Sequence, residues 1–255
     1  MRKRTTAAVW LCAVLVMTGA RAADAVEITL ISAGAVRAVV SSLAEEFAKV
    51  SGHSVRATFG TVGIVRQKLA TEPADVVIAS DTAIDDLMRS GAIVAGSRMD
   101  IARTGVGVGV REGAPKPDIS TSEKFKQAML AAKSIVYVDP AQGATSGIHV
   151  AGVLQRLGIA EAVKSKTILW PGGYAAEAVQ KGDAEIVVHQ ISEILPVKGV
   201  TLVGPLPSDL QKITTYSAGI ATKAQEKPAA ELFIKFLARR ASKAKFAAAG
   251  LDYKE

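Results

Sequence analysis

Two turns in the N-terminal third of the sequence combine small residues with a nearby arginine. The turns Ser32–Ala35 and Gly60–Gly63 each follow a short apolar run, and Arg37 and Arg66 lie in the helical patterns that follow them. Main-chain amides at the start of a helix bind anions, and a guanidinium matches a carboxylate with two parallel hydrogen bonds. The pattern therefore predicts a site for a small anion. The alternative is that these residues form ordinary tight turns and exposed helix faces.

The C-terminal half offers hydrogen-bond donors and one base for the same kind of site. Thr145 and Ser146 lie in a long polar turn after a β-branched run, and Tyr174 follows a Pro-Gly-Gly turn into a helical pattern. His189 ends the apolar run Ile186–Val188, and histidine is suited to moving a proton near neutral pH. We expect His189 to contact the ligand or to act as a base; the alternative is an imidazole bonded to backbone. The predicted ligand-binding residues are Ser32, Gly34, Ala35, Arg37, Thr61, Val62, Arg66, Thr145, Ser146, Tyr174 and His189.

Composition and absent motifs exclude several other chemistries. Cys12 is the single cysteine and the chain has 3 histidines, so neither a disulfide framework nor a Cys- or His-rich metal site is expected. The stretch GVGVG lacks the GxGxxG spacing of a dinucleotide site, and phosphate-loop, HExxH and CxxC motifs are absent. The sequence therefore predicts neither a metal nor a cofactor.

The first 22 residues have the features of a secretory signal peptide. Three positive charges lie within Met1–Arg4, an uncharged and mostly apolar run covers Thr5–Ala20, and Ala20-Arg21-Ala22 offers small residues to a signal peptidase. Cleavage after Ala22 would leave 27 basic against 24 acidic residues, a balance that does not favour nucleic-acid binding. The sequence therefore predicts a protein exported to the periplasm.

The remaining sequence alternates β-branched runs, turns and amphipathic helices. The predicted strands are Glu27–Ser32, Ser54–Phe59, Asp75–Ala79, Ser134–Val138, Thr167–Leu169, Glu185–Val188 and Thr215–Ala221. The predicted helices are Val36–Val50, Gly63–Ala70, Ala83–Ser90, Lys124–Ala132, Val150–Leu157, Tyr174–Lys181, Ile191–Leu195 and Ala229–Ala238. Repeated strand–turn–helix units indicate parallel sheets with helices on both faces, whose ligands bind beyond the carboxyl ends of the strands.

The pattern changes near residue 104 and returns near residue 208. Extended segments at Arg103–Val108 and Val203–Ser208 are expected to link two lobes. We predict an α/β protein with a discontinuous first lobe, residues 23–103 and 208–255, and a second lobe of residues 104–207. Each lobe is expected to hold a mixed, mainly parallel sheet flanked by helices, with the ligand in the cleft between the lobes.

Six stretches of the sequence, taken in order, resemble the molybdate-binding family of solute-binding proteins of ABC transporters. They read ITLISAGAV, ATFGTVG, PADVVIASDTAIDDLMRSGAI, YVDPAQGATSGIHVAGVLQRLGI, EAVQKGDAEIVVHQISEI and AAELFIKFLARRASKAKFAAAGL. The resemblance implies the type II periplasmic binding protein fold and a hinged cleft that captures a small anion. It also implies delivery of that anion to a membrane permease, and we expect the protein to be a monomer.

The ligand-binding turns depart from that family's pattern. Ala35 stands where a serine is usual, Thr61 and Val62 where two serines are usual, and His189 where a tyrosine is frequent. The lost hydroxyls and the arginines nearby favour a carboxylate-bearing ligand over molybdate. The stretch HQISEILPVKGVTLVGPLP is similar to the aconitate isomerases built on this scaffold.

Two hypotheses of different classes follow from the sequence. The first is an exported receptor that binds a small oxyanion or organic acid for an importer. The second is a cofactor-independent isomerase that interconverts cis- and trans-aconitate, with His189 as the base that moves the proton.

Overall fold

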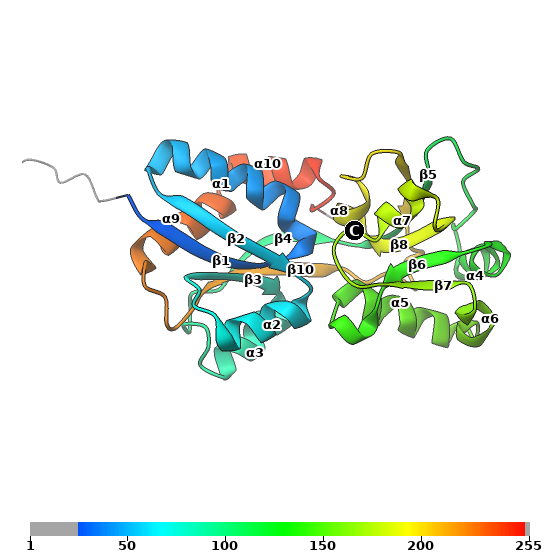
Figure 1. Cartoon of the computed structure of the whole chain (residues 1–255), viewed down its shortest axis with the longest axis horizontal. Coiled ribbons are helices and arrows are strands. Elements are labelled where there is room, and N and C mark those ends of the chain that lie inside the picture. The colour runs from blue at the N-terminus through cyan, green and yellow to red at the C-terminus, as the bar shows by residue number, and fades with distance from the viewer. Residues whose placement is uncertain (1–24, 253–255) are drawn as a thin grey trace, which may run out of the picture.

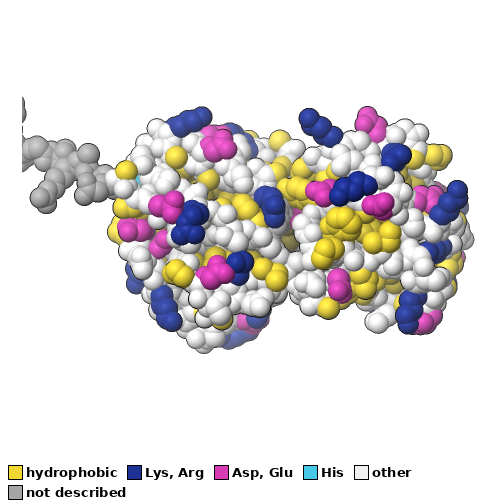
Figure 2. Space-filling model, viewed as in Figure 1, with side chains coloured by type: hydrophobic (Ala, Val, Ile, Leu, Met, Phe, Trp, Pro, Cys, Tyr) yellow, Lys and Arg dark blue, Asp and Glu magenta, His cyan; other side chains and the backbone are white. Residues whose placement is uncertain are grey.

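A computed structural model describes residues 25–252, which form two lobes arranged along the long axis of the molecule (Figure 1). The space-filling view shows a constriction between the lobes (Figure 2). The predicted signal peptide and its cleavage site lie outside the described residues. None of the helices within residues 25–252 has both the length and the apolar character needed to cross a bilayer.

Each lobe contains one five-stranded sheet. In the first lobe the strand order is β2 (Ser54–Gly60), β1 (Glu27–Ala33), β3 (Val76–Ser80), β10 (Thr214–Ile220) and β4 (Met99–Thr104). In the second lobe it is β7 (Thr167–Trp170), β6 (Ile135–Val138), β8 (Ile186–Gln190), β5 (Val106–Arg111) and β9 (Val200–Pro205). The chain passes from β4 to β5 through Gly105 and returns from β9 to β10, so two segments connect the lobes (Figure 1).

Four of the five strands in each sheet run in the same direction. Strand β10 is antiparallel to both β3 and β4, and β5 is antiparallel to both β8 and β9, whereas β1, β2 and β3 are mutually parallel, as are β6, β7 and β8. The mixed, mainly parallel sheets predicted from the sequence are confirmed. The antiparallel strands are those that follow a crossing between the lobes.

Helices cover both faces of each sheet. In the first lobe they are η1 (Gly34–Val36), α1 (Arg37–Ser51), α2 (Val62–Thr71), α3 (Asp81–Arg89), α9 (Lys227–Ala238) and α10 (Arg240–Ala248). In the second lobe they are α4 (Ser122–Ala131), η2 (Pro140–Gln142), α5 (Thr145–Arg156), α6 (Ala160–Lys164), α7 (Ala176–Lys181) and α8 (Ile191–Ile194). Successive residues of β1 alternate between faces: Leu30 packs in the cluster under α1 and α9, and Ile31 in the cluster under α2 and α3.

The structure corrects several element boundaries. Helix α5 begins at Thr145, whereas the sequence predicted a helix from Val150 and a long polar turn at Thr145 and Ser146. Gly147 permits this start because a Cβ there would lie 2.1 Å from the carbonyl oxygen of Val138, so only glycine lets the helix approach β6 so closely. Helices α6 and α10 and strand β4 were not predicted from the sequence, and strands β5 and β9 occupy part of the segments that were predicted only as extended links between the lobes.

The Asp75 carboxylate links three segments of the first lobe through hydrogen bonds. Its Oδ2 accepts a hydrogen bond from the Thr29 amide at 2.8 Å, and its Oδ1 accepts from the amides of Gln225 and Glu226 at 2.8 and 2.9 Å, just before α9. The side chain is buried, so its loss would leave these amides without acceptors. We expect Asp75→Ala to lower the free energy of unfolding by about 2 kcal/mol in urea titrations. Glu45→Ala, at an exposed carboxylate of α1 with no hydrogen bond or ion pair among the described residues, is the control and should change it by less than about 0.5 kcal/mol.

Candidate functional site

A small cavity of about 30 Å³ lies where loops of the two lobes meet. It is lined by Gly34, Arg37, Gly60, Thr61, Val138, Ala144, Thr145, Ser146, Gly173, His189, Gln190, Glu193 and Tyr216. Most of these residues follow the carboxyl ends of β1, β2, β6, β7 and β8, as expected for sheets of this kind. A cavity needs at least about 10–15 Å³ to hold one water, so in this arrangement the site has room for one carboxylate group of an anion, and the rest of a larger anion would lie outside it in the cleft.

The lobes are in contact around this cavity. The hydroxyl of Thr61 in the first lobe donates to the carbonyl oxygen of Gln142 in the second at 2.5 Å, and the Gly63 amide donates to the carbonyl oxygen of Gly143 at 3.2 Å. The Thr61 oxygen also accepts from the Ile64 amide and so caps α2. Thr61 therefore couples the start of one helix to closure of the cleft.

Arg37 is the cavity's positive charge. It is the first residue of α1, and its guanidinium lies 5.2 Å from the ring centroid of Phe59 and 5.8 Å from that of Tyr174, which belongs to the other lobe. Its Nε is buried and has no hydrogen-bond partner among the described residues. A buried donor without an acceptor costs about 1–3 kcal/mol, and a ligand oxygen would remove that cost.

His189 and Ser146 form a buried pair from the second lobe. The Nδ1 of His189 lies 3.0 Å from the Ser146 hydroxyl, and its Nε2 lies 3.1 Å from the carbonyl oxygen of Gly173. Because a carbonyl only accepts, Nε2 carries the proton, and in the neutral ring Nδ1 accepts from Ser146. The imidazole therefore holds the serine hydroxyl at the first turn of α5, whose amides and dipole favour an anion.

Glu193 on α8 is a functional candidate that the sequence analysis missed. Its Oε2 lies 3.5 Å from Nε2 of His189, and its Oε1 lies near Gly34, where a Cβ would be 3.1 Å away. Burial raises the pKa of the Glu193 carboxyl, and the nearby His189 and Arg37 oppose that rise. The spacing His189-x-x-x-Glu193 at a strand end was the available signal.

Gln190 and Tyr216 complete the polar wall and were also missed. The Gln190 amide nitrogen lies 3.3 Å from both the Thr214 hydroxyl and the Tyr216 hydroxyl, so residues of the two lobes are joined behind the cavity. The Gln190 Oε1 is buried with no partner among the described residues. Burial raises the pKa of Tyr216 well above its ordinary value, and Glu193 adds to the rise, so this hydroxyl stays neutral.

The structure brings together many, but not all, of the predicted residues. Gly34, Arg37, Thr61, Thr145, Ser146 and His189 line the cavity, and the Tyr174 ring faces Arg37 beside it. Burial raises the pKa of Tyr174, and Arg37 opposes this rise.

Tyr174 lies beside the cavity, and four other predicted residues lie farther from it. Ser32 is buried and its hydroxyl donates to the Ala33 carbonyl at 3.1 Å. Ala35 and Val62 pack with the first lobe's core. Arg66 is exposed and pairs with Asp86 of α3 at 2.5 Å. It is the fifth residue of α2, and at about 1.5 Å of rise per residue it lies beyond the helix start that reaches the cleft.

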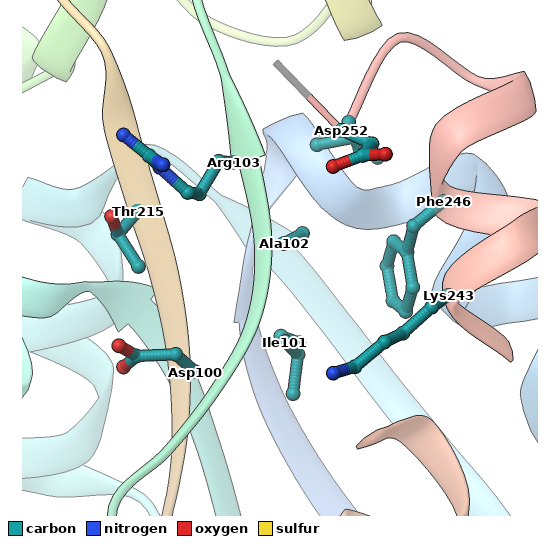
Figure 3. Close-up of a pocket in the computed structure, with 9 residues that line it drawn as sticks. Asp100, Ile101, Ala102, Arg103, Thr215, Lys243, Phe246 and Asp252 are labelled. Carbon is teal, nitrogen blue, oxygen red and sulfur yellow. The ribbon is translucent and has the colours of Figure 1, made fainter. Parts of the chain in front are cut away.

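A larger pocket of about 430 Å³ lies entirely within the first lobe, between β4, β10, α10 and the end of the described chain (Figure 3). In Figure 3, Asp100 and Arg103 lie on one side of β4, and Lys243 and Asp252 on the other. Asp100 is already engaged by the Ser217 hydroxyl at 2.6 Å and by Arg98 at 3.0 Å. Within residues 25–252 no group of three His, Cys, Asp or Glu side chains could hold a metal ion. The inter-lobe cavity is therefore the candidate site.

Comparison with known proteins agrees with this architecture. The chain is 31% identical to an aconitate isomerase of Pseudomonas sp over 220 residues, which cover 84% of this chain and 82% of that protein. It is 32% identical to the molybdate-binding protein ModA of Azotobacter vinelandii over 225 residues, 85% and 86% of the two chains.

Solved structures share the fold. The periplasmic molybdate-binding protein of Azotobacter vinelandii superposes with a TM-score of 0.75 at 22% identity, covering 89% of this chain and 100% of that one. The sulfate-binding protein SubI of Mycobacterium tuberculosis H37Rv gives a TM-score of 0.71 at 18% identity, covering 89% and 86%. Residues 28–252 match the family described as bacterial extracellular solute-binding protein, and the chain belongs to that family.

Proposed function

We propose that the chain binds a small carboxylate-bearing anion in the inter-lobe cavity. The observation that carries this proposal is Arg37, a half-buried cation in the cavity wall whose buried Nε lacks a hydrogen-bond acceptor among the described residues. The first turn of α5 faces it from the other lobe with Thr145 and Ser146. A carboxylate held between a guanidinium and a helix start would gain charge-assisted hydrogen bonds from both lobes.

Ligand contacts from both lobes would favour the closed arrangement. The lobes already touch through Thr61 and Gln142, so a ligand that bridges Arg37 and α5 adds its binding energy to closure. A ligand shifts an open–closed equilibrium only by binding one state better than the other, and these contacts exist together only when the cleft is closed. We infer that the protein is exported to the periplasm and delivers its anion to an ABC permease. The family, the signal-peptide pattern at the N-terminus and the likeness to periplasmic binding proteins support this role.

Thermal unfolding tests the binding proposal. The chain starting at Ala23 is heated with molybdate, tungstate, sulfate, citrate, cis-aconitate or trans-aconitate in turn. A ligand that binds only the folded protein adds about 2.7 kcal/mol of stability at about 100 times its Kd, which gives a visible rise in Tm. We expect citrate or an aconitate to raise the Tm more than molybdate does. A rise with molybdate and tungstate alone would contradict the carboxylate proposal, and no rise with any of the six would contradict anion binding.

One observation favours a second candidate, the interconversion of cis- and trans-aconitate. The buried Ser146–His189–Glu193 cluster supplies proton acceptors at the cavity, and a receptor has no need for them. In this reaction a base removes a proton from one carbon of the substrate, the double bond shifts, and a proton returns to the other allylic carbon. His189 could receive the proton through the Ser146 hydroxyl that it holds.

Replacing His189 separates the two candidates. If the protein is an isomerase, His189→Gln should lower turnover by about 10²- to 10⁴-fold, because the proton acceptor is lost. Conversion is followed by proton nuclear magnetic resonance of the aconitate mixture, and binding by calorimetry. His149→Gln is the control, because the His149 ring bonds the Leu210 carbonyl at 2.8 Å and does not line the cavity. If the wild-type chain binds aconitate without converting it, the isomerase candidate fails and the receptor remains the proposed function.

A further inference from the structure

The charges around the cavity sum to nearly zero when Glu193 is ionised. Among the lining residues Arg37 supplies one positive charge and Glu193 one negative charge, and an uncharged His189 ring can make both of its hydrogen bonds, to Ser146 and to Gly173. The other titratable groups that face Glu193 are the hydroxyls of Tyr174 and Tyr216, both kept neutral by burial. An anion that enters this cavity would lose its hydration without meeting a net positive charge.

The Glu193 carboxylate has few interactions that stabilise its negative charge. It accepts no hydrogen bond from a described residue, and Nε2 of His189, which lies 3.5 Å from Oε2, is already directed at the Gly173 carbonyl. Glu193 is only 7% exposed. Burying a carboxylate with one distant partner costs much free energy. Burying the neutral acid costs less, and the acid can donate one hydrogen bond.

Protonation of Glu193 would change both the net charge of the lining and the hydrogen bonding of the carboxyl group. If a proton joins the Glu193 carboxylate, the lining residues carry a net positive charge through Arg37, and the new hydroxyl can donate to an oxygen of the anion. The carboxyl lies on the second lobe and approaches Gly34 of the first, so it meets the first lobe only in the closed arrangement.

We propose that the cavity takes up its anion together with one proton from solvent, and that Glu193 is the residue that receives it. The inference rests on the proposed anion binding. One O–H bond forms on Glu193, and no bond of the ligand breaks. The affinity for the anion should therefore fall about tenfold for each unit by which the pH rises, in the range where the empty protein has released this proton and the complex retains it.

Calorimetry in two buffers of different ionisation enthalpy counts the protons taken up. The probes are cis-aconitate and sulfate, both fully ionised at about pH 8, so that the protein is the only source of a change in protonation. We expect the wild-type chain to take up about one proton per bound anion and Glu193→Gln to take up about none. The glutamine mimics the neutral acid, so the affinity of this variant should also lose its pH dependence.

The experiment includes a matched control variant and a second measurement, the pH dependence of wild-type affinity. Glu177→Gln removes a carboxylate of α7 that pairs with Lys181 outside the cavity, and it should keep the wild-type proton count. Should Glu193→Gln fail to fold, the pH dependence of wild-type affinity still tests the inference. Equal proton counts for the wild type and Glu193→Gln, or a wild-type affinity independent of pH between about 6 and 8.5, would overturn proton uptake while leaving anion binding intact. If neither probe binds the wild-type chain, the proposed function fails for these anions and the inference fails with it.

Discussion

Replacing Arg37 by methionine is expected to weaken anion binding by about 10²- to 10³-fold, because the cavity loses its charged donor. Methionine keeps a long, unbranched side chain that can still pack beside Phe59 and Tyr174, so the aromatic surroundings should persist. The measurement is calorimetric titration with the anion that raises the Tm of the wild-type chain most. The fold should survive, because the Arg37 Nε has no hydrogen-bond partner among the described residues.

Arg66→Met is the matched control for this experiment. Arg66 lies near the start of the next helix, in the same strand–turn–helix context, but it is exposed and paired with Asp86. Its removal should change anion affinity by less than about twofold, because exposed ion pairs contribute little. Loss of binding in both variants would indicate a general electrostatic effect of the lobe. Unchanged binding in Arg37→Met would place the ligand away from this cavity.

The contrast between these arginines shows how far the sequence can predict the site. Both were predicted as ligand contacts because each follows a turn at the carboxyl end of a strand. Position along the helix separates them: Arg37 is the first residue of α1, whereas Arg66 is the fifth of α2 and faces α3. The missing information was where each helix begins, which depends on the 3-10 turn Gly34–Val36 and on the Thr61 cap.

The fold was more predictable than the site because its signals are local. The β3 run and the helix after it contain enough apolar residues to be recognised within a short window. Helix α10 was missed because Phe246 is its one large apolar residue, and β4 because it is an edge strand with charged residues. Strand β4, with the sequence MDIART, therefore lacks an apolar run.

The missed site residues depend on contacts that no local pattern contains. Tyr216 lies within β10 and looks like a core residue, yet its hydroxyl meets Gln190 from the other lobe. Glu193 reaches Gly34 only because the lobes are closed. Sequence reasoning finds residues at strand ends, but it cannot determine which of them meet across a cleft.

Closure of the cleft depends on two facing glycines. Gly63 is the second residue of α2, and a Cβ there would lie 2.6 Å from the carbonyl oxygen of Gln142 and 3.0 Å from Cα of Gly143. Both are backbone atoms of the second lobe and cannot move aside as a flexible side chain could. Gly143 has a φ of 65° and would itself place a Cβ 2.8 Å from Cα of Gly63.

Gly63→Ala is therefore expected to lower anion affinity by about a hundredfold, because an added methyl group obstructs the closed state that holds the ligand. The open state lacks this contact, and alanine favours a helix over glycine by up to about 1 kcal/mol. The Tm without ligand should thus stay the same or rise while affinity falls. This opposite response distinguishes impaired closure from damage to the fold.

Gly152→Ala supplies the matched control, since Gly152 also lies within a helix and a Cβ there has no neighbour within 4 Å. That variant should gain the same helix stabilisation and bind the anion as the wild type does. Small-angle scattering adds a direct readout, because ligand should make the wild-type and Gly152→Ala chains more compact and leave Gly63→Ala extended. If Gly63→Ala instead binds and compacts normally, the ligand-bound lobes do not approach as closely as Gly63 and Gly143 do here. The ligand would then be held in a wider cleft, with room for a larger anion than the cavity of about 30 Å³ accepts.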